Sequence, residues 1–288
     1  MGMELGIIFG LIAMLGYGLS NGMSQKIVKK EGIVRTAVFR NVFIVLLLLP
    51  VLLYFLPASG VSLTFVMIAL MIGIVGYVPL VTFYKAIEKG KVGVITPISN
   101  SSFLVTILLS VVFFGEILSP SNAFSVLLIV AGIILISVDF RDFSGSGIFR
   151  ISSGIPIAVL TCFLWGMVFF LLKIPVSVVG PVISSFLLEL GVLLVSGINM
   201  KFSGISHHLP GRWMLSEIFL VALFGTAGSL FYNLGISVSD VSVVVALSFS
   251  SPFIAAVYGR IAYKERLRLI QYVAIIVILS GIFLLSFF

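Results

Sequence analysis

The sequence has few charged residues and few of the side chains that carry enzymatic or metal chemistry. Asp, Glu, Lys and Arg make up 9% of its 288 residues, and it holds two His and one Cys. Soluble domains carry about 25% charged residues. One Cys cannot form an intramolecular disulfide, and the adjacent His207 and His208 lack the further ligands that a metal site needs. A Walker-type Gly-Lys-Ser/Thr sequence is also missing, which argues against an ATP-driven pump. We expect no metal, no cofactor and no enzymatic centre.

Apolar residues, in contrast, make up 60% of the chain and gather in continuous runs. A run of about 20 residues spans the hydrocarbon core of a bilayer. Because the runs are continuous rather than alternating, they predict helices and not a membrane β-barrel. The expected fold is an all-α integral membrane protein with ten transmembrane helices, near Leu5–Ser24, Ile33–Leu56, Leu63–Ile87, Val92–Phe114, Ser121–Val138, Ile155–Leu172, Val179–Ile198, Met214–Ser237, Val241–Ala262 and Leu269–Phe287.

The basic residues lie in alternate connecting segments. Fifteen of the 17 Lys and Arg lie in, or within one helical turn of, the segments that join the first run to the second, the third to the fourth, and so on to the ninth and tenth. By the positive-inside rule these segments face the cytoplasm, so both termini are predicted on the non-cytoplasmic side of the cell membrane. The net charge of +7 is spread over these short segments rather than gathered on one face, which argues against nucleic acid as a partner.

The two halves of the chain repeat each other. A split near Gly145–Gly147 leaves five runs on each side, so we predict repeats at residues 1–143 and 148–288. Because five is odd, the second repeat enters the bilayer in the opposite direction, as in many secondary transporters. Chance agreement between two apolar sequences is the alternative. Duplication is favoured by polar, Gly and acidic matches in the same order: at a shift of 149 residues Ser99 with Ser248, Ser102 with Ser251 and Glu116 with Glu265, and at 148 Gly18 with Gly166.

These motifs resemble the EamA-like family of the drug/metabolite transporter superfamily. The resemblance rests on Tyr17-Gly18 and Trp165-Gly166 in the first run of each half, on Arg40, and on the Glu-x-Leu sequences at Glu116 and Glu265. It covers essentially the whole chain. It implies a secondary active transporter, an exporter of small organic metabolites such as amino acids, that works by alternating access around a midplane cavity. Proton exchange or the substrate gradient would drive it, as a monomer or homodimer.

Other classes of function stay open beside this resemblance. A lipid-head-group flippase is the first alternative, and it predicts a lateral opening. An intramembrane enzyme would need a nucleophile or metal cluster near the interface, and the sequence shows no such cluster. A channel is the third alternative, against which paired inverted repeats weigh.

Two ionisable residues lie well inside the predicted helices. Glu189 is near the middle of the seventh, and Arg40 is about two turns into the second. Such residues are costly in a bilayer and mark functional sites by default. At a shift of 148 residues Asn41 matches Glu189, so we expect Arg40, Asn41 and Glu189 to face one cavity, with Glu189 as proton-coupling group or counter-charge. The alternative is a structural hydrogen bond for Glu189 and an Arg40 that extends to the interface.

Polar and aromatic residues of both halves complete the candidate substrate site. Small hydroxylated residues can line a path, but they also serve helix packing. Aromatic residues recur near matching positions and suit an amino-acid-like solute, with core packing as the alternative. The candidates are Thr96, Ser99, Asn100, Ser248 and Ser251, with Tyr17, Tyr84, Trp165 and Tyr232.

Four residues are candidates for bends or gates. Pro97 and Pro252 free backbone carbonyls in the fourth and ninth helices. Phe103 stands in the first half where Pro252 stands in the second, so the fourth helix is expected to bend elsewhere than the ninth. Glu116 and Glu265 end these helices, where a carboxylate is unfavourable with the helix dipole and needs a partner. The resemblance implies pivots or gates for them, and an interfacial charge is the alternative.

Overall fold

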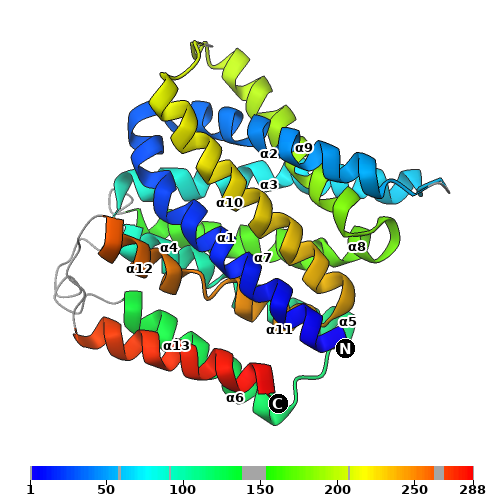
Figure 1. Ribbon diagram of the computed structural model, residues 1–288, viewed down its shortest axis with the longest axis vertical. Coiled ribbons are helices and arrows are strands. Elements are labelled where there is room, and N and C mark those ends of the chain that lie inside the picture. Colours follow the sequence, from blue (N-terminus) through cyan, green and yellow to red (C-terminus); the bar gives the residue numbers. More distant parts are fainter. Residues whose placement is uncertain are drawn as a thin grey trace.

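The structure is a computed structural model that describes residues 2–57, 60–90, 92–137, 154–206, 208–262 and 269–287. Within these ranges it contains thirteen α-helices and no strand (Figure 1). The all-α class predicted from the sequence is therefore confirmed. The helices are α1 Gly2–Glu31, α2 Ile33–Phe55, α3 Leu63–Lys89, α4 Val92–Asn100, α5 Ser102–Phe114, α6 Pro120–Ser137, α7 Ile155–Leu171, α8 Lys173–Val179, α9 Pro181–Phe202, α10 Arg212–Val238, α11 Val241–Ser248, α12 Pro252–Ala262 and α13 Leu269–Phe287.

The helices follow the apolar runs of the sequence. Eight runs form one helix each, and the fourth and ninth form two, namely α4 with α5 and α11 with α12, while α8 lies between the predicted sixth and seventh runs. Six helical segments in the described residues are long and apolar enough to cross a membrane: α1, α2, α3, α9, α10, and α7 joined with α8. The other apolar helices are shorter.

The fourth and ninth runs are interrupted at matching positions. The first interruption is Ser101, and the second is Phe249–Ser251, which corresponds to it at a shift of 149 residues. This corrects the expectation that the missing proline moves the bend, because α4 continues through Pro97. Ser side chains bond to the backbone near both interruptions, with Ser102 Oγ donating to Asn100 O (3.4 Å) and Ser250 Oγ to Ala246 O (2.8 Å). Such bonds compete with regular helix.

Helices of the two halves pack against each other in pairs. α1 lies along α10, α3 and α2 along α9, and α6 along α13, which form one edge of the molecule (Figure 1). α4 contacts α12 and α5 contacts α11, so the interrupted segments cross near their breaks. The start of α1 and the end of α13 lie at the same end of the molecule.

Two glycines make matching close approaches across these pairs. A Cβ atom on Gly18 would lie 2.5 Å from Ile254 Cβ and 2.8 Å from Ser251 O. A Cβ on Gly166 would lie 2.5 Å from Val105 Cβ and 2.9 Å from Ser102 O. Small residues permit such close helix packing. Val105 and Ser102 correspond to Ile254 and Ser251 at a shift of 149 residues. The first helix of each half therefore makes the same contact with the interrupted helix of the other half.

Candidate functional site

A cavity of about 60 Å³ lies among helices of both halves. By volume it has room for about four water molecules, or for a solute of a few heavy atoms. α1, α2, α3 and α4 line it from the first half, and α7, α9 and the break after α11 line it from the second. The lining residues are Tyr17, Ser20, Asn21, Ser24, Arg40, Gly76, Leu80, Phe83, Tyr84, Asn100, Trp165, Phe169, Leu188, Glu189, Val192 and Phe249.

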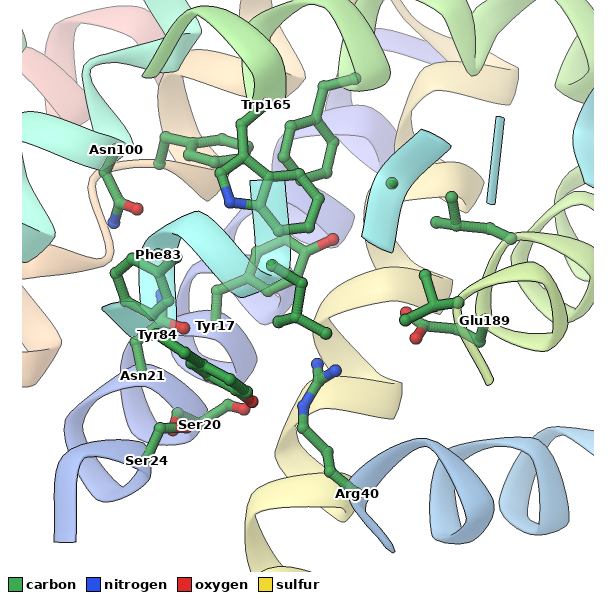
Figure 2. Close-up of a pocket in the computed structure, with 16 residues that line it drawn as sticks. Tyr17, Ser20, Asn21, Ser24, Arg40, Phe83, Tyr84, Asn100, Trp165 and Glu189 are labelled. Carbon is green, nitrogen blue, oxygen red and sulfur yellow. The ribbon is translucent and has the colours of Figure 1, made fainter. Parts of the chain in front are cut away.

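Polar groups and aromatic rings together line the cavity. Figure 2 shows Arg40 reaching into the space below Trp165, with Glu189 on one side and the hydroxyl-bearing stretch of α1 on the other. Tyr17, Ser20, Asn21 and Ser24 come from one stripe of α1, spaced by three, one and three residues. Residues at i, i+3, i+4 and i+7 share a helix face, which explains why all four reach the cavity.

Arg40 and Glu189 are joined through Asn41. Arg40 Nη1 donates to Asn41 Oδ1 at 3.0 Å, and Asn41 Nδ2 donates to Glu189 Oε2 at 2.8 Å and to Glu189 O at 3.3 Å. Asn41 is fully buried and Glu189 is 7% exposed. The three residues predicted to share a cavity thus lie together. Arg40 and Glu189 line it, while Asn41 stands behind them as the amide that both bind.

The aromatic rings of the cavity form a packed group. Trp165 stacks on Phe169 with ring centroids 5.1 Å apart, and Tyr17 and Phe249 meet Phe169 edge-on at 6.1 and 4.6 Å. Of the four predicted aromatic residues, Tyr17, Tyr84 and Trp165 line the cavity. Tyr232 is fully buried behind the wall, where its hydroxyl donates to Phe169 O at 3.1 Å.

The predicted hydroxyl and amide residues near the helix breaks are all buried, and one lines the cavity. Asn100 does so, and its Nδ2 donates to Ser251 Oγ at 2.8 Å, which joins the two breaks. Ser248 Oγ donates to Val244 O within its own helix. Thr96 and Ser99 are 2% and 1% exposed, and neither hydroxyl has a hydrogen-bond partner in the part of the chain that is described.

Glu116 ends up against a helix N-terminus from the other half. Its Oε1 accepts from Val241 N at 2.7 Å, and its Oε2 accepts from Ser242 N at 2.9 Å and from Ser242 Oγ. The first turn of α11 therefore supplies the hydrogen-bond donors that the Glu116 carboxylate lacks at the end of its own helix. Asp240, the residue at the N-cap position of α11, makes no side-chain capping bond. Glu265, its match in the second half, lies outside the described residues, as does His207.

Sequence reasoning missed part of the cavity wall. Ser20, Asn21 and Ser24 were not singled out, although their spacing from Tyr17 is a signal that periodicity contains. Phe169 follows Trp165 by one helical turn and was detectable in the same way. Phe249 was not, because it lines the cavity from an interruption of the ninth run. Among the described residues, no three His, Cys, Asp or Glu side chains are grouped as a metal site requires.

Comparisons with known proteins match the chain to a family of transporters. The family model described as the EamA-like transporter family matches twice, at residues 4–138 and 152–287. A protein of Archaeoglobus fulgidus described as an uncharacterized transporter is 25% identical over 287 residues, 98% of each chain. An uncharacterized protein of Methanocaldococcus jannaschii is 29% identical over 138 residues, which are 47% of this chain and 98% of that protein.

The fold also occurs among solved structures. One of them, described only as the crystal structure of a protein, superposes with a TM-score of 0.79, with 98% of both chains covered and 15% sequence identity. At that identity the likeness concerns the fold alone.

Proposed function

Because the chain belongs to the EamA-like transporter family, we propose that it is a secondary active transporter that exports small organic metabolites such as amino acids. The observation that carries the substrate class is the cavity, where a guanidinium and a carboxylate face the same small space (Figure 2). A zwitterionic solute matches this pair: its carboxylate faces Arg40, its ammonium group faces Glu189, and its apolar part faces the aromatic rings.

The arrangement around Arg40 favours an anionic group as its ligand. In the part of the chain that the structure describes, the hydrogen bond to Asn41 is the one that Arg40 makes, and no carboxylate pairs with it. A guanidinium has five N–H donors, so four are left for a solute or water. Two parallel donors suit a carboxylate. Glu189 Oε2 is held by the Asn41 amide, which leaves its other oxygen as an acceptor for an ammonium group or a proton.

Alternating access between two inverted repeats is the mechanism we propose. Three observations support it. The family model matches each half separately, and a relative about half as long aligns over nearly its whole length. In addition, Gly18 and Gly166 each make the same close contact with the other half. The proposed repeats are residues 1–143 and 148–288, and each supplies part of the cavity wall. Rocking of one repeat against the other would expose the cavity to either side in turn.

The loop charges indicate which end of the proposed cavity faces the cytoplasm. With Lys- and Arg-rich loops in the cytoplasm and both termini outside, the stripe of Ser20, Asn21 and Ser24 lies in the cytoplasmic half of α1. An exporter loads its substrate from that side. Glu116 and the first turn of α11 then lie at the opposite, outer end, where their hydrogen bonds hold the exit closed. Proton coupling is assigned to Glu189.

Reconstitution into liposomes tests the proposal. Purified protein is expected to exchange labelled amino acids from a panel that runs from alanine to phenylalanine. Alaninamide, which lacks the carboxylate, should compete at least tenfold more weakly than alanine, and Arg40→Gln should remove that preference. Glu189→Gln should abolish the response to an imposed pH gradient. If no amino acid exchanges while head-group-labelled lipids cross the bilayer, the protein is a flippase and the proposal is wrong.

A further inference from the structure

The guanidinium of Arg40 rests on a glycine of another helix. A Cβ atom on Gly225 of α10 would lie 2.8 Å from Arg40 Nη2, and 3.4 Å from both Ile44 Cδ1 and Ser20 Oγ. The first of these distances is shorter than side-chain carbons tolerate. Gly225 does not line the cavity. Because Gly225 has no side chain, the guanidinium of Arg40, which lines the cavity, can occupy this space.

The other end of the guanidinium is held by Asn41. Arg40 Nη1 donates to Asn41 Oδ1 at 3.0 Å, while the Asn41 amide nitrogen donates to Glu189. These bonds fix which way the amide points, since its oxygen must face Arg40 and its nitrogen Glu189. Ser20 Oγ donates to Val221 O, one turn before Gly225, so α1 is bonded to α10 beside the same spot at 3.0 Å.

We propose that Gly225 and Asn41 are positioning residues for Arg40, and that Gly225 sets the preference of the cavity for anionic groups without touching the solute. Gly225 gives the guanidinium room to reach the cavity, and Asn41 keeps it from turning onto Glu189. This inference rests on the proposed role of Arg40 as the site for the solute's carboxylate. It adds Gly225, which does not line the cavity and belongs to none of the sequence motifs.

The substitution Gly225→Ala displaces Arg40 and leaves the fold in place. Gly225 lies within helix α10, where alanine is favoured over glycine. The atom that the new methyl group would meet is the end of a long flexible side chain, not backbone. Arg40 is thus the group that must move. Gly197 of α9 provides the matched control, because a Cβ atom there meets nothing within 4 Å.

The two tryptophans provide a readout that needs no known substrate. Trp165 lines the cavity and Trp213 is 88% exposed. In a Trp213→Phe background, excitation selective for tryptophan reports on Trp165 alone, since the chain has two Trp. Iodide, an anion, and acrylamide, a neutral molecule, are used as quenchers at constant ionic strength. The ratio of their quenching constants reports the positive potential that Arg40 creates in the cavity.

We expect this ratio to fall at least twofold in Arg40→Gln and by a similar factor in Gly225→Ala, and to stay unchanged in Gly197→Ala. The double variant Arg40→Gln with Gly225→Ala should be no lower than Arg40→Gln alone, because the glycine acts through the arginine. Asn41→Ala should also lower the ratio, since Arg40 can then turn onto Glu189. Adding Glu189→Gln to Asn41→Ala should raise the ratio more than Glu189→Gln does alone, because it also releases Arg40, whereas after a mere loss of packing the rise would be the same in both backgrounds.

The outcomes separate the inference from the function on which it rests. If Arg40→Gln lowers the ratio and Gly225→Ala does not, the positioning role of Gly225 is wrong and the role of Arg40 stands. If Gly225→Ala weakens quenching by iodide and acrylamide equally, the methyl group closes the cavity, and the inference is again wrong. If Arg40→Gln leaves the ratio unchanged, or iodide does not quench Trp165 in the parent, the proposed anion site fails and the inference fails with it.

Discussion

Glu116 provides the sharpest test of how the two halves are joined, because it caps a helix from 125 residues away. Its carboxylate accepts from the backbone N–H groups of Val241 and Ser242 and from the Ser242 hydroxyl. Helix N-termini leave their first N–H groups without partners inside the helix. Capping bonds contribute about 0.5–2 kcal/mol, and a negative charge at an N-terminus adds about 0.3–1 kcal/mol. We therefore assign about 2 kcal/mol to the whole interaction.

Glu116→Ala should remove this stabilisation from the first turn of α11. A loss of about 2 kcal/mol raises the equilibrium constant for local opening, and with it the rate of amide exchange, roughly 30-fold, since about 1.4 kcal/mol corresponds to a factor of ten. Glu116→Gln should raise it by about fivefold: one oxygen still accepts, but the charge is lost and the amide nitrogen faces an N–H group. Hydrogen exchange of the Val241 and Ser242 amides, measured by mass spectrometry on purified protein, gives these rates.

Asp240→Ala is the control for this measurement. Asp240 occupies the N-cap position of α11, where Asp is a preferred residue, yet its side chain makes no capping bond. Exchange in Asp240→Ala should stay within about threefold of the parent, the range of most surface substitutions. If Asp240→Ala opens α11 as much as Glu116→Ala does, the capping role of Glu116 is refuted. Equal effects of Glu116→Gln and Glu116→Ala would instead refute the contribution of the remaining acceptor oxygen.

Three further changes test the packing around the cavity. Tyr232→Phe removes a buried bond to Phe169 O and should lower the free energy of unfolding by about 1 kcal/mol, measured by thermal melting in detergent, with alanine affinity unchanged. Gly132→Ala and Gly281→Ala place a Cβ within 2.9 Å of backbone in α13 and α6 respectively, so each should destabilise by about 1–3 kcal/mol. Unequal effects would contradict the matching contacts. Asn100→Ala removes the bond between the helix breaks and should cost about 0.6 kcal/mol, while a loss above 2 kcal/mol would show a larger structural role.

The helices were predictable from the sequence, and their interruptions were not. Runs of apolar residues must form helices in a bilayer, because no water is present to bond the backbone. Whether a helix continues through a polar stretch depends on local competition for a few hydrogen bonds. Pro97 was expected to mark the bend, but α4 continues to Asn100 and breaks at Ser101. Side-chain bonds such as that of Ser102 to Asn100 O involve less than a turn of chain and leave no periodic signal.

Site residues of a type that is rare in this chain could be predicted from the sequence, and those of a common type could not. Arg40 and Glu189 stood out because ionisable residues are costly inside a bilayer, and both line the cavity. Serines are common in this chain, and Ser20 lines the cavity while Ser248 bonds within its own helix. The need of Glu116 for a partner followed from its helix end. The identity of that partner required the fold, because α11 lies in the other half of the chain.

The hydrogen bond between Asn41 and Glu189 indicates where the proposed symmetry axis lies. The two residues are 148 positions apart, the shift that aligns the first helices of the two halves. In a two-fold arrangement, equivalent residues touch each other only close to the axis. Asn41 and Glu189 therefore lie near it, and so does the cavity beside them. Their side chains differ, as do Arg40 and its match Leu188. In the proposed mechanism, a two-fold symmetric frame would carry an asymmetric charge pair at its centre, so that one solute would bind in a single orientation while the halves exchange conformations around it.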